Sequence, residues 1–156
     1  MRGQGRASVT PEAAGPQSLD AVVLDTSALM AILLGEPESA ACAAVLGSEA
    51  RLLISAGTLA EALIVAGNRG IGTEMATLVA EGGVEVVPVT AATAARVAEA
   101  YAVWGKGHHP AGINFGDCFA YALARETGCP VLYVGQDFAR TDVAATAVQG
   151  PALPTL

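Results

Sequence analysis

AVVLDTSALMAILL, at residues 21–34, is the segment that decides the fold we expect for this chain. Its first four residues are all apolar, which predicts a strand buried on both faces of a sheet. Thr26 and Ser27 can cap a helix over the rest of the segment, and Gly35 is a suitable residue to end it. A buried strand that leads directly into a helix is typical of parallel α/β sheets.

Strands and helices alternate along the rest of the chain. Short apolar runs predict strands at 51–55, 84–87 and 131–134, and the residues between them predict helices at 37–46, 58–68, 73–80, 90–104 and 116–126. We therefore expect one α/β domain over residues 21–150, with a mostly parallel sheet covered by helices on both faces. Residues 1–20 and 151–156 are interpreted as flexible tails.

Length, cysteine content and hydropathy restrict the class of protein. A chain of 156 residues has the size of one ordinary domain. Its three cysteines are odd in number and far apart, which argues against a disulfide framework and a structural zinc site. There is no secretory signal and no apolar stretch of membrane-spanning length. These features predict a cytoplasmic protein that is not associated with a membrane.

The charge balance limits how this chain can bind nucleic acid. Eight Lys and Arg face fifteen Asp and Glu, giving a net charge of −7. Such an acidic protein has no broad electrostatic attraction for a phosphate backbone. If it acts on a phosphodiester, the positive charge must come from a bound metal and a few local basic residues.

Four carboxylates lie where the strands of such a sheet are expected to end, and they are the candidate site: Asp25, Glu61, Asp117 and Asp137. Ligands of open parallel sheets bind at the carboxyl edge of the strands, so the four acids can converge there. Ionised carboxylates among apolar residues are costly unless a cation neutralises them. Because no Lys or Arg stands beside them in the sequence, we expect a divalent metal ion.

Each acid also has an ordinary structural interpretation. Asp25 could be a helix N-cap, and Glu61 could complete a capping box with Thr58. Asp117 would be stabilised by the helix dipole, and Asp137 could be a turn residue. A metal site would be absent only if all four structural interpretations were correct at once, so the four acids taken together favour a site.

Several polar residues near the acids are weaker candidates. Thr26 or Ser27 could orient Asp25 or bind a phosphate, although helix capping is the default role. Asn114 could orient Asp117 or cap the helix that follows. Lys106, the only lysine, lies in a Gly-rich loop that leads to Asp117 and is a candidate for substrate contact.

Four ordered segments carry a family resemblance: Leu24–Ala28, Thr58–Glu61, Asn114–Cys118 and Asp137–Asp142. They resemble the successive motifs of PIN-domain ribonucleases, and most closely those of the VapC-type toxins of bacterial toxin–antitoxin pairs. The resemblance covers residue 21 to about residue 143. It implies a three-layer α/β/α sandwich, an endoribonuclease dependent on Mg²⁺ or Mn²⁺ that leaves a 5′-phosphate and a 3′-hydroxyl, a VapB-like antitoxin partner, and homodimers.

The expected metal chemistry divides the four acids into two pairs. Mg²⁺ binds oxygen ligands, uses one or two carboxylates and keeps several waters. We expect Asp25 and Asp117 to contact the ion, and Glu61 and Asp137 to hold water or a second ion. RNA would be the substrate.

Three other interpretations remain open. The chain could be a catalytically silent PIN-like binding module. It could be an α/β phosphatase of the haloacid dehalogenase type with Asp25 as nucleophile, although such enzymes need an Asp where Ser27 stands. A cysteine hydrolase could use Cys118 with His108 or His109, but the preceding Asp117 would raise the pKa of its thiol.

Overall fold

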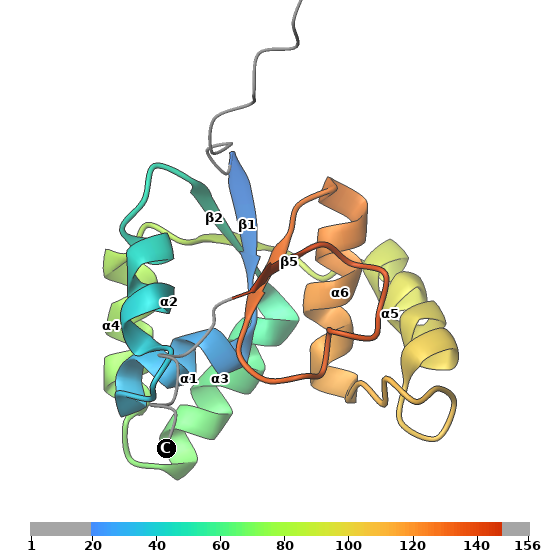
Figure 1. The fold of residues 1–156 in the computed structure, drawn as a ribbon, viewed down its shortest axis with the longest axis horizontal. Coiled ribbons are helices and arrows are strands. Elements are labelled where there is room, and N and C mark those ends of the chain that lie inside the picture. Colours follow the sequence, from blue (N-terminus) through green and yellow to red (C-terminus); the bar gives the residue numbers. More distant parts are fainter. Residues whose placement is uncertain (1–19, 148–156) are drawn as a thin grey trace, which may run out of the picture.

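The computed structural model describes residues 20–147, and these form an α/β domain built on one parallel sheet (Figure 1). The strand order is β3-β2-β1-β4-β5, and every neighbouring pair is parallel. The elements are β1 (Ala21–Leu24), α1 (Thr26–Leu34), α2 (Ser39–Leu46), β2 (Arg51–Ser55), α3 (Ala56–Asn68), α4 (Gly72–Glu81), β3 (Glu85–Val87), α5 (Ala91–Trp104), α6 (Phe115–Thr127), β4 (Val131–Tyr133) and β5 (Ala145–Ala147). The predicted α/β fold with a parallel sheet is confirmed.

Alternate residues of the central strands enter two separate cores, because successive side chains of a strand point to opposite faces. Val23, Leu53 and Val131 pack with residues of α5 and α6. Val22 and Leu132, their neighbours, pack with residues of α1 to α4. The sheet is therefore the middle layer of a three-layer α/β/α sandwich, and each central strand carries an apolar run because both faces are covered.

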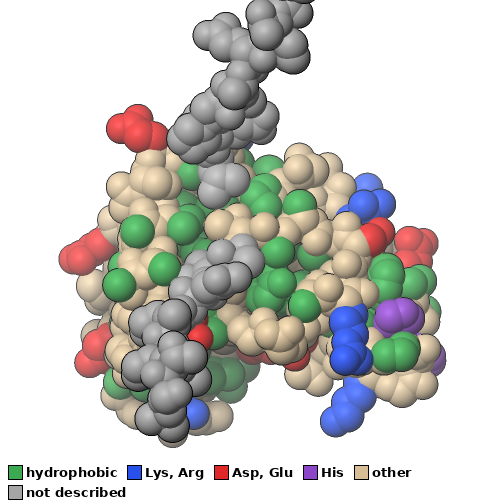
Figure 2. Space-filling model, viewed as in Figure 1, with side chains coloured by type: hydrophobic (Ala, Val, Ile, Leu, Met, Phe, Trp, Pro, Cys, Tyr) green, Lys and Arg blue, Asp and Glu red, His purple; other side chains and the backbone are tan. Residues whose placement is uncertain are grey.

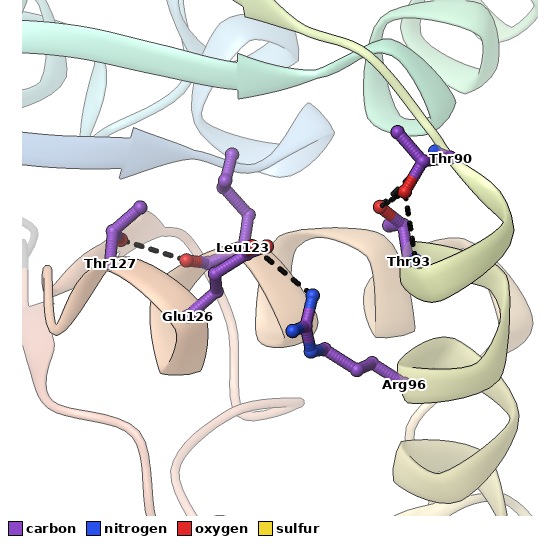
Figure 3. Close-up of polar contacts among 6 residues, drawn as sticks. All are labelled: Thr90, Thr93, Arg96, Leu123, Glu126 and Thr127. Carbon is purple, nitrogen blue, oxygen red and sulfur yellow. Dashed lines mark hydrogen bonds and ion pairs between the residues drawn. The ribbon is translucent and has the colours of Figure 1, made fainter.

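Polar contacts fix the ends of the helix pair α5 and α6 (Figure 3). Thr90 caps α5 through reciprocal contacts with Thr93. Arg96 of α5 forms an ion pair of 3.1 Å with Glu126 of α6. Both side chains of that pair are about half exposed, so its contribution to the free energy of unfolding is below about 1 kcal/mol. The apolar contacts of the two helices with the sheet hold this layer in place.

Two predicted helix starts are wrong. Helix α3 begins at Ala56, and the Ser55 side chain accepts a hydrogen bond from the Gly57 N–H as its N-cap. Thr58 is therefore fully buried inside the helix, and it forms no capping box with Glu61. The reason is that β2 continues to Ser55 and leads into α3 without a loop. Helix α2 begins at Ser39, two residues after the predicted start at residue 37. Asp25, rather than Thr26 or Ser27, caps α1, so the capping interpretation of Asp25 is confirmed.

The edge strand β5 was not predicted from the sequence. Its residues Ala145–Ala147 pair with β4, and its Ala-Thr-Ala sequence lacks the apolar run that identified the other strands. The tails predicted at residues 1–20 and 151–156 lie outside the described residues, apart from Asp20.

None of the helices in the described part of the chain is, by itself, long and apolar enough to cross a membrane. Helices α1 and α2 together reach the length and apolar composition of a membrane span, but a bend of 116° separates them.

Figure 2 shows the face of the molecule seen in Figure 1, with acidic side chains mainly at the edges of this view and basic and histidine side chains mostly where α5 and α6 lie.

Candidate functional site

A pocket of about 290 Å³ contains all four carboxylates of the predicted site. It lies where β1, β2 and β4 end and the helices α1, α3 and α6 begin or pass. Its lining includes Asp25, Thr26, Ser27, Glu36, Glu61, Val65, Arg69, Asn114, Asp117 and Asp137. The expected convergence of acids at the carboxyl edge of the sheet is thus observed.

Asp25 uses its two carboxylate oxygens differently. Oδ2 accepts hydrogen bonds from the backbone N–H of Ser27 (3.1 Å) and from the Ser27 hydroxyl (2.6 Å), so this oxygen caps α1. Oδ1 is buried and has no hydrogen-bond partner among the described residues. Ser27 Oγ in turn accepts a hydrogen bond of 3.0 Å from the Val134 N–H. One hydroxyl therefore fixes the Asp25 carboxylate and ties it to the chain at the end of β4.

Asp117 stands in the first turn of α6 and is only 7% exposed. Its Oδ2 accepts a hydrogen bond of 2.9 Å from the backbone N–H of Asn114, the residue at the N-cap position. The backbone of Asn114 thus orients Asp117, and its side chain lines the same pocket. Asn114 occupies the N-cap position of α6, and it is its backbone N–H that orients Asp117.

Glu61 reaches the pocket because α3 and α6 pack unusually closely. A Cβ atom at Gly57 of α3 would overlap the ring of Phe119, and a Cβ at Gly116 of α6 would overlap the Glu61 carboxylate. Gly57 is required by the rigid ring of Phe119, whereas a side chain at Gly116 would push away the flexible end of Glu61. The close approach brings the Glu61 carboxylate against the first turn of α6, next to Asp117.

Asp137 is the exposed member of the set. It follows Gly135, whose φ of 100° favours glycine, in the turn that leaves β4. Phe138, the next residue, is 2% exposed and packs on Tyr133 with ring centroids 5.1 Å apart. The buried Phe138 anchors the turn, so Asp137 faces the pocket from a fixed point.

Burial and mutual repulsion raise the pKa of the two innermost acids. Desolvation raises the pKa of Asp25 to about 6, against the effect of the Ser27 hydrogen bonds and with a smaller contribution from the charges of Glu61 and Asp137. The pKa of Asp117 is raised to about 7, chiefly by desolvation and to a smaller extent by the charges of the other three acids, against the effect of the Asn114 hydrogen bond. The pocket therefore carries negative charge that needs a cation for its stabilisation near neutral pH.

The residues of the pocket fit a hard divalent cation held by few protein ligands. Within residues 20–147, no three carboxylate, imidazole or thiol groups are close enough to form a ready three-ligand site. Mg²⁺ needs only one or two carboxylates and keeps its remaining waters. The unpartnered Oδ1 of Asp25 and the raised pKa of Asp117 are the features that such an ion would relieve.

The structure separates Lys106 from this pocket and adds two residues that the sequence did not single out. Lys106 is exposed in the loop after α5 and is not part of the lining. Glu36 and Arg69 do line it. Arg69 is the C-cap residue of α3, eight residues after Glu61, and its place in the lining depends on how α3 ends and packs.

The cysteine-hydrolase interpretation is not supported by the surroundings of Cys118. Its side chain is fully buried, and burial together with Asp117 raises the pKa of the thiol to about 11. His108 and His109 pack on Tyr101 and Trp104 instead. A buried, protonated thiol is not a nucleophile.

The fold and the site together define the class of protein. It is a three-layer α/β/α sandwich with an acidic pocket at the carboxyl edge of its sheet. The family model of the PIN domain matches residues 22–144. The chain belongs to the PIN-domain family, and its relatives place it among the VapC-type ribonucleases.

Relatives of known family cover most of the chain. Ribonuclease VapC30 of Mycobacterium tuberculosis is 41% identical over 130 residues, which are 81% of this chain and 99% of the relative. Ribonuclease VapC of Mycolicibacterium smegmatis is 41% identical over 127 residues, covering 80% and 98%. Among solved structures, Mycobacterium tuberculosis VapC20, described as a sarcin-ricin loop cleaving toxin, matches with a TM-score of 0.66 at 19% identity, covering 80% of this chain and 97% of that one. This structural likeness supports the fold.

Proposed function

We propose that this protein is the toxin of a toxin–antitoxin pair and hydrolyses RNA phosphodiester bonds with a divalent cation held by its acidic pocket. The observation that carries the proposal is the unpartnered, buried Oδ1 of Asp25 in a pocket that gathers acids from four separate segments. The relatives named as VapC ribonucleases support the same activity.

The residues of the pocket have distinct proposed roles. Asp25 and Asp117 would hold Mg²⁺ or Mn²⁺, because they are the most buried acids and each has one oxygen already fixed by a hydrogen bond. Ser27 and the backbone of Asn114 keep these carboxylates in position. When bound, the cation would supply positive charge at the cleaved phosphate and make a water easier to deprotonate. Glu61 and Asp137 would orient that water.

RNA cleavage under defined metal conditions tests the proposal. The purified protein should cleave RNA with Mg²⁺ or Mn²⁺ and stop cleaving in EDTA. Asp117→Asn should abolish cleavage, since it removes a negative charge from the pocket without changing its shape. Asp142→Asn is the matched control, because Asp142 bonds to the Tyr121 hydroxyl and pairs with Arg125 outside the pocket. Cleavage that persists in EDTA or in Asp117→Asn would exclude this mechanism.

The proposal includes an inhibitory partner. Structures that match this fold include a toxin–antitoxin complex from Klebsiella pneumoniae and VapBC2 from Rickettsia felis bound to a DNA fragment of its promoter. We place this protein in the cytoplasm with a VapB-like antitoxin. Co-expression with the protein encoded beside it should yield a complex that does not cleave RNA.

The proposal also includes a homodimer. An almost wholly apolar groove of about 450 Å³ lies between α5 and α6, lined by Val89, Ala94, Val97, Ala98, Tyr101, Phe115 and Phe119. Phe115 at its edge is 66% exposed. The small residues Ala94 and Ala98 would allow a helix of a second copy to approach closely. Light scattering should show a dimer at micromolar concentration, and a strict monomer would contradict it.

A further inference from the structure

Arg69 is the only cation among the residues that line the acidic pocket. The other arginines of the described chain, with one exception, are held in ion pairs: Arg51 with Glu85, Arg96 with Glu126 and Arg125 with Asp142. The exception, Arg140, donates a hydrogen bond of 3.3 Å to the carbonyl of Pro110. For Arg69, no ion pair or side-chain hydrogen bond is found within residues 20–147, although two glutamates share its pocket.

The helix places Arg69 beside the carboxylates without contact to them. Glu61, Val65 and Arg69 follow one another at intervals of four residues along one side of α3, and all three line the pocket. Eight residues of helix correspond to a rise of about 12 Å. Arg69 is the exposed C-cap residue of α3, so its guanidinium is free to meet a ligand.

That offset fits a strand of nucleic acid better than a single small ion. In the proposed function the cleaved phosphate lies at Asp25 and Asp117. The backbone of Arg69 is about 12 Å along the helix from that of Glu61, so its side chain is placed for a different phosphate of the same strand. Arginine binds phosphate through two parallel hydrogen bonds, which fixes orientation as well as position. In a chain with a net charge of −7, one such contact is a large part of the available attraction.

We propose that Arg69 binds a backbone phosphate of the RNA next to the cleaved bond and so holds the substrate strand across the acidic pocket. This inference rests on the proposed ribonuclease function. The competing role for Arg69 is electrostatic only: a cation at a helix C-terminus that interacts favourably with the helix dipole and with the pocket acids.

RNA binding in a cleavage-deficient background separates these roles. The reference is Asp117→Asn, and the probe is a short fluorescein-labelled single-stranded RNA of mixed sequence, with affinity measured by anisotropy over a series of salt concentrations. Adding Arg69→Ala should weaken binding about tenfold, the loss expected for a hydrogen-bonded charge. It should also flatten the plot of log affinity against log salt by about 0.7, the value for one phosphate of a single strand. Arg69→Lys, which keeps the charge, should retain most of the slope.

Arg51→Ala is the matched control. It removes the same charge, but Arg51 begins β2 at the edge of the sheet opposite the pocket, and its side chain is 67% exposed. We expect this variant to change the affinity less than twofold, as is usual for an exposed surface pair.

The outcomes separate the two proposals. If the reference binds RNA, and Arg69→Ala matches Arg51→Ala in affinity and salt slope, the role of Arg69 is overturned while the ribonuclease proposal stands. Tighter binding of Mn²⁺ by Arg69→Ala with an unchanged salt slope would identify the electrostatic role and would also overturn the inference. If the reference does not bind RNA and the unmodified protein does not cleave it, the ribonuclease proposal fails first.

Discussion

Replacing Asp117 by Asn should make the protein more stable while it destroys the activity. In the folded protein the pKa of Asp117 is raised from 3.8 to about 7, chiefly by desolvation. Between these two values the folded protein binds a proton that the unfolded chain has released. The free energy of unfolding therefore falls as the pH rises through this window. The Asp117→Asn variant has no charge to bury, and its amide oxygen can still accept the hydrogen bond from the Asn114 N–H.

The size of the gain follows from the same pKa. A rise of about three in pKa corresponds to about 4 kcal/mol at a pH above both values. Because the shift includes repulsion by the charges of neighbouring acids as well as desolvation, this figure is an upper limit for one substitution. We expect the variant to gain roughly 2 kcal/mol at about pH 8 in EDTA and nothing near pH 4.

Urea unfolding followed by the fluorescence of Trp104, the only tryptophan, measures this difference. Glu49→Gln is the control, since it removes one negative charge from an exposed position outside the pocket. Saturating Mg²⁺ should reduce the difference in the free energy of unfolding between Asp117→Asn and the unmodified protein. The ion neutralises the unmodified pocket and stabilises the folded state that binds it. A variant less stable than the unmodified protein at pH 8, or a difference independent of pH, would refute the reasoning.

Three further predictions concern metal, packing and assembly. Mn²⁺ should raise the melting temperature by mass action, and a calorimetric scan of Asp25→Asn with Asp117→Asn should show that the rise is lost. Gly116→Ala should displace the flexible end of Glu61 with little change in the free energy of unfolding and should reduce single-turnover cleavage; normal cleavage would show that the position of Glu61 does not matter. Phe115→Glu should yield monomers in light scattering without a lower melting temperature, since the ring is mostly exposed; a persistent dimer would place the interface elsewhere.

The sequence predicted those parts of the fold that depend on continuous apolar runs. The central strands β1, β2 and β4 are covered on both faces, so each contains a continuous run of apolar residues that the sequence shows directly. The edge strand β5 has no such requirement, and its short Ala-Thr-Ala sequence could not be distinguished from a loop. The start of α3 was misplaced because Ser55 and Thr58 are both good caps, and only the course of the chain after β2 decides between them.

The sequence predicted which acids form the candidate site, but not how their side chains are bonded or which other residues line the pocket. The positions of Asp25 and Asp137 after strands, and of Glu61 and Asp117 near helix starts, predicted that the four acids would converge. The sequence could not show that Asp25 divides its two oxygens between a helix cap and the pocket. Nor could it show that Arg69, rather than the lone lysine, shares the pocket, because the lining depends on how α3 packs against α6.

Because Asp25 both caps α1 and lines the acidic pocket, mutations that inactivate an enzyme of this kind differ in their effect on its stability. Asp25→Ala removes the cap of α1 together with the pocket oxygen, at a cost of about 1 kcal/mol for the cap alone, whereas Asp25→Asn can keep the cap. Asp117→Asn inactivates and stabilises. Selection for cells that survive expression of this protein should therefore recover two kinds of survivor: less abundant protein that has lost the α1 cap, and abundant, folded protein such as Asp117→Asn. The second kind would still occupy the antitoxin and leave an active copy in the same cell unrestrained.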